Sequence, residues 1–315
     1  MPAPWIGAHV TANPGPWGRQ NQVDQLRAMH ASTARLQMYT GGGQYILFNG
    51  SYQWRPWFAD AEVDAIVQVI RENGGVHLIM QSSELVTVDA SAGQQNSIAD
   101  QWNTAKFFAR RYPDLTLTFE IGNEPDVNFP NAPEATRDRY MRCVQYCRGS
   151  KPSNAMIGVS NVLGNADYFN RFSTPGPYGS PIHDVDVVCT HCYLLGGNRS
   201  FCPGSASNGD DWARNIRWIR SWNADKTIFV TEAGIETADR NYRAPRNVEF
   251  AYNIQRWSQD FSRALKGVTG GYCDVACFYC VGYDVQNGVE TVWRINETDT
   301  PYYGNRTLPN PRECP

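Results

Sequence analysis

The sequence lacks the features of membrane, nucleic-acid-binding and disordered proteins. No apolar run approaches the roughly 20 residues that a membrane span requires, and no run of lysines or arginines occurs. Charged residues make up 19% of the 315 residues and the formal net charge is -3, so nothing attracts a polyanion. Hydrophobic residues make up 42%, enough for a large core. We therefore expect a soluble globule that binds neither nucleic acid nor membrane, and we expect a monomer.

The N-terminal stretch also lacks the charged and apolar regions of a secretory signal peptide. It enters a strand-like pattern almost directly, as in a mature exported protein or in one that is not exported. N-glycosylation sequons occur at Asn49, Asn198, Asn296 and Asn305 and weakly favour secretion. We expect a secreted or extracellular protein, with a cytoplasmic location left open.

The nine cysteines are an odd number, so at least one is free or pairs between chains. A CxxC occupies 189–192 and three cysteines crowd 273–280, but alternate residues of a strand point to opposite faces. These spacings do not converge on one ion, so we expect no metal site. Loop disulfides that use Cys202 or Cys314 are a stronger expectation, and buried thiols are the strongest one for the strands.

Short apolar or β-branched segments recur along the chain, each followed by polar loop residues and a helix-like pattern. The expected strands lie at 5–10, 33–39, 76–81, 115–122, 155–162, 185–193, 227–234 and 275–282. The expected helices lie at 20–31, 59–73, 98–112, 132–149, 165–173, 210–223 and 248–267. Such alternation is typical of parallel strands buried on both sides, and eight units close most simply into a (β/α)8 TIM barrel. We predict one α/β barrel domain over 1–315. A doubly wound open sheet is the alternative, but no GxGxxG turn supports it.

Two glutamates stand at the ends of predicted strands, where a barrel places its active site. Glu124 stands at the end of the fourth strand in "GNEPD", and Glu232 stands near the end of the seventh in "FVTEAG". Because these strands are not neighbours, the two carboxylates should face each other across the barrel mouth. Glu120, in the middle of the fourth strand, is expected to be an interior polar group without a role in the chemistry.

The segments "FEIGNEPD", "THCY" and "VTEAG" resemble the retaining glycoside hydrolases of clan A. The resemblance implies that Glu124 is the general acid/base and Glu232 the nucleophile. In such enzymes one carboxyl group protonates the leaving oxygen while the other attacks the anomeric carbon. No cofactor is implied.

The same resemblance assigns roles to other residues of the predicted strands. Arg35 corresponds to the arginine that keeps the nucleophile ionised, and Asn123 to the residue that binds the sugar 2-hydroxyl. His191 and Tyr193 share one face of their strand, and they correspond to the pair that contacts the acid/base and the nucleophile. His9 is a weaker candidate for a substrate contact.

Aromatic residues suggest where a sugar chain stacks. The predicted loop 41–58 carries several of them, including Trp54 and Trp57, on the face where barrels bind substrate. Tyr279 is the candidate in the eighth strand. These residues favour several subsites, and hence an enzyme that acts within a polysaccharide or oligosaccharide chain.

The resemblance leaves the family and the substrate open. Family 5 of the clan usually has a histidine at the end of the third strand, where this chain has Gln81 and Ser82. The motif "EIGNEPD" also resembles the glucuronidase and heparanase family, which generally adds a β-domain for which this chain is short. An exo-acting or glucuronidase-like enzyme, a transglycosylase and a catalytically silent carbohydrate-binding barrel remain as alternatives.

Overall fold

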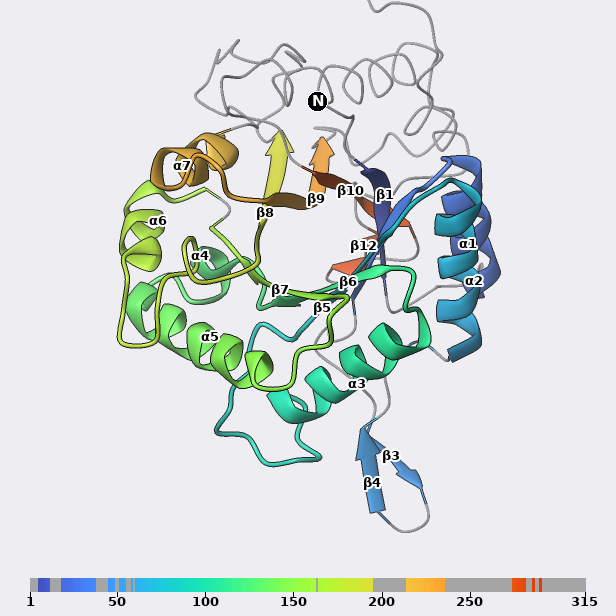
Figure 1. Ribbon diagram of the computed structural model, residues 1–315, viewed down its shortest axis with the longest axis horizontal. Coiled ribbons are helices and arrows are strands. Elements are labelled where there is room, and N and C mark those ends of the chain that lie inside the picture. The colour runs from blue at the N-terminus through green and yellow to red at the C-terminus, as the bar shows by residue number, and fades with distance from the viewer. Residues whose placement is uncertain are drawn as a thin grey trace, which may run out of the picture.

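Eight parallel strands form a closed barrel with the helices arranged around it (Figure 1). The computed structural model describes residues 5–11, 18–37, 45–48, 51–54, 58, 60–162, 164–194, 214–235, 274–281, 285–286 and 289–290. The barrel strands are β1 (Trp5–Val10), β2 (Thr33–Gln37), β5 (His77–Gln81), β6 (Thr116–Ile121), β7 (Ala155–Ser160), β8 (Val187–Leu194), β9 (Ile228–Ile235) and β10 (Val275–Val281). They pair in this order, and β10 closes on β1. All eight predicted strands and the TIM-barrel prediction are confirmed.

The helices confirm the predicted alternation within the described residues. They are α1 (Gly18–Ala28), α2 (Asp60–Glu72), α3 (Ile98–Arg111), α5 (Pro133–Arg148), α6 (Ala166–Ser173) and α7 (Arg214–Trp222). The helix predicted at 248–267 lies outside the described residues. Side chains cap two helices, because Ser97 accepts a hydrogen bond from Asp100 N before α3 and Asn165 accepts one from Tyr168 N before α6. None of the described helices is long and apolar enough to cross a membrane.

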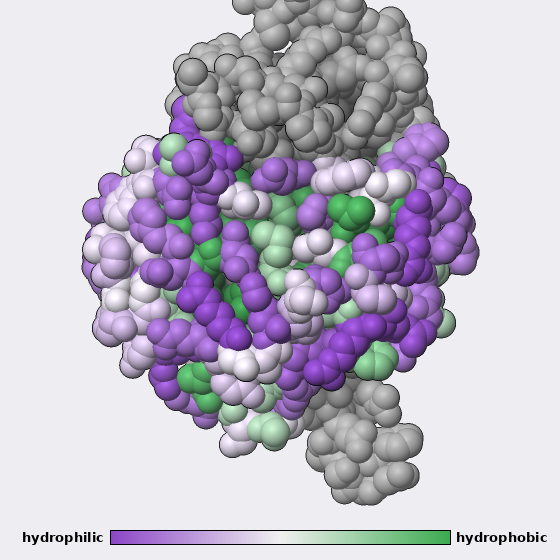
Figure 2. Space-filling view, viewed as in Figure 1, coloured by the Kyte–Doolittle hydropathy of each residue, from purple (hydrophilic) through white to green (hydrophobic). Residues whose placement is uncertain are grey.

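The strands separate two cores. Residues such as Leu78, Met80 and Val188 pack with the helices in the larger core. The alternating residues fill the barrel with a second cluster made of Ile79, Val187, Cys189, Phe229, Val275 and Cys277. In Figure 2, hydrophilic residues cover most of the ring of helices, and hydrophobic residues are visible toward the middle of this face.

Buried thiols are confirmed in the described strands. Cys189 and Cys277 are free and buried, as is Cys143 of α5. Burial raises the pKa of Cys277 and Cys143 to about 12, so both remain protonated thiols at neutral pH. The proposed disulfide partners Cys202 and Cys314 lie outside the described residues.

One predicted loop is wrong in part. Within 41–58 the chain forms an antiparallel hairpin of β3 (Tyr45–Phe48) and β4 (Ser51–Trp54), which Figure 1 shows apart from the barrel strands. The sequence at 49–50 is Asn-Gly, a strong signal for a two-residue hairpin turn between strand-forming residues. A short unpredicted helix, α4 (Pro125–Asn128), follows β6, and β11 (Val285–Gln286) pairs with β12 (Val289–Glu290).

Candidate active site

The chain turns sharply after β6, and this turn carries Glu124 to the end of the barrel. Gly122 has φ +82, and a Cβ there would lie 2.3 Å from the ring of Tyr140, so only glycine fits. Glu124 itself has φ 33, which is rare for a residue with a side chain. Its backbone N–H donates to Ser160 Oγ at 3.3 Å, and Pro125 begins α4 directly afterwards. The strain is typical of a functional position that its surroundings hold in place.

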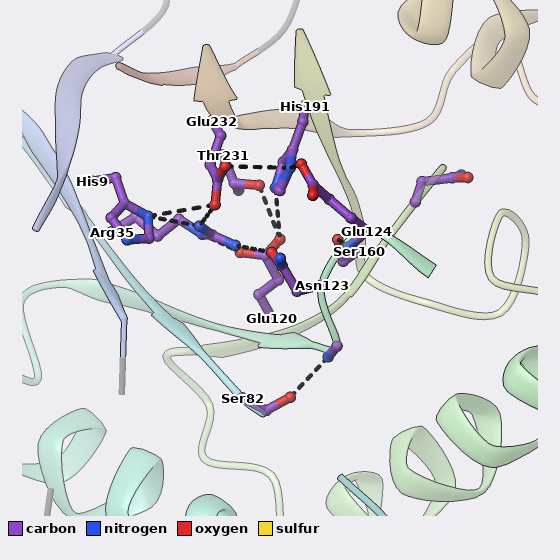
Figure 3. A network of polar contacts seen from close by, with 12 residues as sticks. His9, Arg35, Ser82, Glu120, Asn123, Glu124, Ser160, His191, Thr231 and Glu232 are labelled. Carbon is purple, nitrogen blue, oxygen red and sulfur yellow. Dashed lines mark hydrogen bonds and ion pairs between the residues drawn. The ribbon is translucent and has the colours of Figure 1, made fainter. Parts of the chain in front are cut away.

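Arg35 lies at the centre of a buried polar network inside the barrel (Figure 3). Its guanidinium donates to the carboxylate of Glu232, to Glu120 Oε2 at 2.6 Å and to Asn123 Oδ1 at 3.2 Å. It also lies 2.7 Å from His9 Nδ1. Burial by itself lowers the pKa of Arg35, but the charges of Glu120 and Glu232 outweigh burial and raise this pKa above its ordinary value. Arg35 is therefore a permanent cation beside Glu232.

His191 lies between the two glutamates predicted to do the chemistry (Figure 3). Its Nδ1 is 2.8 Å from Glu124 Oε1 and 3.5 Å from Glu232 Oε2. Burial opposes a charge on the imidazole, yet the carboxylates of Glu232 and Glu124 outweigh burial and raise the pKa of His191. In its protonated form His191 donates from Nδ1 to Glu124, which orients that carboxyl group.

Glu124 and Glu232 reach the same point from β6 and β9. A carboxylate oxygen of one lies within 4.8 Å of a carboxylate oxygen of the other. The Glu124 side chain is 18% exposed and that of Glu232 is 8% exposed, so both border the barrel opening. In glycoside hydrolases a separation of about 5 to 5.5 Å is typical of retention, while inversion needs about 6.5 to 9.5 Å for a water. The observed spacing fits direct attack by a carboxylate.

Glu124, His191 and Glu232 also have the donor types that bind a divalent cation. Arg35 donates directly to Glu232, so a cation held there would face a fixed positive charge at short range. The raised pKa of His191 favours the protonated ring, which has no free lone pair for a metal. The group is therefore better suited to proton transfer than to metal binding, and the expected absence of a metal stays a prediction.

The structure brings six of the predicted site residues together in one network. These are His9, Arg35, Asn123, Glu124, His191 and Glu232. His9 is fully buried beside Arg35. For Trp54, Tyr193 and Tyr279 the structure places only the backbone, in β4, β8 and β10. Their side chains, and all of Trp57, lie outside the described residues, so their roles as sugar contacts stay predictions.

Three network residues were not predicted as part of the site. Ser160 holds the backbone of Glu124, and Glu120 is bonded to both Arg35 and Thr231. A signal for the ion pair was present in the sequence, since Arg35 is the only Lys or Arg in the eight predicted strands. A glutamate within an apolar strand needs such a cation when it is buried.

A family model for Cellulase (glycosyl hydrolase family 5) matches residues 3–259. Among solved structures, the endo-β-1,4-mannanase from Thermotoga petrophila is similar with a TM-score of 0.56 and 13% identity, over 95% of this chain and 75% of that one. A β-glucuronidase from an uncultured Clostridium sp. is similar with a TM-score of 0.52 and 13% identity, over 88% of this chain and 44% of that one. The chain thus spans less than half of that glucuronidase. No curated protein matches the sequence significantly. At these identities the structural likeness shows a shared fold.

Proposed function

Because the chain belongs to glycosyl hydrolase family 5, we propose that it is a retaining β-glycoside hydrolase acting on β-linked polysaccharides or oligosaccharides. The family match selects one family where the sequence motifs left the choice open, although Gln81 and Ser82 stand in place of the usual histidine. The observation that carries the retaining mechanism is the approach of Glu124 and Glu232 oxygens to within 4.8 Å.

In the proposed reaction Glu232 attacks the anomeric carbon while Glu124 gives its proton to the leaving oxygen. The bond from the anomeric carbon to that oxygen breaks as the glycosyl ester to Glu232 forms. Glu124, now a carboxylate, takes a proton from water, and the water oxygen displaces Glu232 from the sugar. Arg35 keeps Glu232 charged through its permanent guanidinium. Asn123 is held by Arg35 through Oδ1, which leaves its amide N–H groups for a sugar hydroxyl.

We favour cleavage within the chain of the substrate over cleavage at its end. This preference rests on the number of aromatic residues in 41–58, which offer stacking faces for more than one sugar ring. A hydrolysis screen over β-glucans, xylans, mannans, galactans and glucuronides would identify the substrate. An early fall in viscosity with few new reducing ends supports endo action, and steady release of single sugars would contradict it.

The test of the mechanism is chemical rescue on an aryl glycoside of the sugar found in that screen. We expect Glu232→Ala and Glu124→Ala each to lose at least about a hundredfold in activity, the general scale for acid/base catalysis. Azide should rescue Glu232→Ala with inverted anomeric configuration, because azide enters from the side that the carboxylate vacated. It should rescue Glu124→Ala with retained configuration, because the glycosyl ester to Glu232 still forms.

Glu84→Ala is a matched control, since Glu84 follows β5 at the same end of the barrel. Among the described residues, its hydrogen bonds are those that its backbone carbonyl accepts from Arg139 and Tyr140. Its activity should stay near that of the wild type. Retained activity in both site variants would show the assignment to be wrong, and so would the same anomer from both azide reactions.

A further inference from the structure

Glu120 is a second carboxylate on Arg35, deeper in the barrel than Glu232. Its side chain is 0% exposed, so it cannot touch a substrate at the barrel opening. Both of its oxygens have partners, since Oε2 accepts from Arg35 Nε at 2.6 Å and Oε1 accepts from Thr231 Oγ1 at 2.9 Å. A buried carboxylate held on both sides adds rigidity to the groups that hold it.

The two hydrogen-bond partners of Glu120, Arg35 and Thr231, also support Glu232. Glu120 Oε1 lies 4.0 Å from His191 Nε2 as well. The guanidinium of Arg35 donates to Glu232 through Nη1 while Nε faces Glu120. Thr231 precedes Glu232 in the chain, and neighbouring strand residues normally face opposite sides. The pairing of β8 with β9 shifts at this point, from Thr190 opposite Val230 to His191 opposite Glu232, so Thr231 is an extra residue. Such a bulge lets both Thr231 and Glu232 turn into the network.

We propose that Glu120 is a positioning residue that fixes Arg35 and Thr231 behind Glu232 and so holds the nucleophile in line with the anomeric carbon. The proposal rests on the proposed function, in which Glu232 is the nucleophile. Glu120 also shares the charge of Arg35. Without it, the whole guanidinium charge would act on Glu232 and stabilise the carboxylate before it attacks.

The first test is Glu120→Gln, which keeps the shape of the side chain and removes its charge. We expect kcat to fall roughly a hundredfold, the scale for a reacting group misplaced by about 1 Å, while KM stays near the wild-type value because no substrate contact is lost. Glu120→Asp keeps the charge on a shorter side chain. It should recover part of the lost kcat.

The pH profile of kcat/KM separates positioning from a general loosening of the fold. Replacing Glu120 by Gln removes one negative charge and leaves Arg35 to Glu232 alone, and both changes favour the ionised nucleophile. The acid limb of the profile should therefore move to lower pH. The other titratable groups near Glu232 stay in place, namely His9 at 3.7 Å, His191 at 3.5 Å and Glu124. In Glu120→Asp the limb should stay where it is in the wild type.

The second test uses two matched threonines of the barrel. Thr231→Val removes the hydroxyl bonded to Glu120, and Thr118→Val makes the same change on β6 at an equally buried site. Thr118 Oγ1 has no hydrogen-bond partner among the described residues. Only Thr231→Val should lower kcat, by roughly tenfold, the scale of one net hydrogen bond of about 1.4 kcal/mol. If Glu120→Gln fails to fold, the comparison of Thr231→Val with Thr118→Val still tests the proposal.

Several outcomes would overturn the proposal. One is a near-normal kcat in Thr231→Val, and another is an equal loss of kcat in Thr118→Val. A third is a folded Glu120→Gln whose acid limb of kcat/KM stays at the wild-type pH. These outcomes differ from a failure of the proposed function, in which Glu232→Ala would itself remain active. An inactive Glu232→Ala beside a fully active Glu120→Gln would reject the positioning role alone.

Discussion

Replacing Arg35 by methionine should cost more stability than any comparable change at the surface. Methionine has a similar length and no charge, so the substitution leaves Glu120 and Glu232 in the barrel without their shared cation. Removing one partner of a buried ion pair costs about 3 to 5 kcal/mol, because the remaining charge is uncompensated. A chain of this size loses about 2 °C in Tm for each kcal/mol. We therefore expect Tm to fall by about 6 to 10 °C at neutral pH.

The loss should depend on pH in a defined direction. In the variant, the folded protein relieves the repulsion between the two carboxylates by taking up a proton that the unfolded chain does not bind near neutrality. A folded state that binds more protons gains stability as pH falls. The difference in Tm between wild type and Arg35→Met should shrink from about pH 7 to about pH 5. Thermal unfolding followed by circular dichroism at several pH values measures both effects.

Arg71→Met is the matched control for this experiment. Arg71 makes a two-pronged pair with Asp114 at 2.7 and 2.8 Å, close to the 2.6 Å between Arg35 and Glu120, but its side chain is 39% exposed. Exposed pairs contribute at most about 1 kcal/mol, so Tm should fall by less than about 2 °C. Equal losses in the two variants would refute the reasoning, as would an Arg35→Met deficit that grows on acidification.

Two further predictions concern the residues that orient Glu124. Gly122→Ala should lower both Tm and kcat, since the φ of +82 strains alanine by about 1 to 3 kcal/mol and the new Cβ meets Tyr140. Gly93→Ala is the control, because Gly93 has φ +88 and no atom lies within 4 Å of a Cβ placed there. This variant should have the backbone strain alone and keep full activity. Equal kcat values in Gly122→Ala and Gly93→Ala would contradict the role of the clash with Tyr140. The fold raises the pKa of His191 above its ordinary value of 6.5. Protonated His191 therefore stabilises the folded protein fully below about pH 6.5, and this stabilisation is lost as pH rises through the pKa of the folded protein. His191→Asn should therefore lose less Tm than wild type as pH rises above about 6.5, and an equal loss of Tm in the two proteins would contradict this prediction.

Most of the barrel could be predicted from the sequence because its signals are local. Segments such as 76–81 and 155–162 are apolar and β-branched over a strand length, and amphipathic helices follow them. The structure has strands at both places, each shifted by no more than two residues. The signal for the hairpin within 41–58 was also local, namely the Asn-Gly pair at 49–50 of the sequence.

The candidate site was predictable where a motif marks the end of a strand. Glu124 follows β6 and Glu232 lies near the end of β9, and in a closed barrel the ends of parallel strands meet at one opening. The partnership of Glu120 with Arg35 was not marked in this way. The two residues are far apart in sequence, and each alone resembles a misplaced charge within a strand.

The sequence by itself determined the order of strands and helices, the barrel, and the two carboxylates at its opening, because periodicity and short motifs act over neighbouring residues. Only the tertiary structure decided how those carboxylates are supported. Three features depend on strands that are distant in the chain. They are the left-handed backbone of Glu124, the extra residue Thr231 in β9, and the contact of Arg35 with both Glu120 and Glu232. Their geometry depends on packing and charge pairing inside a closed barrel, which local patterns do not encode.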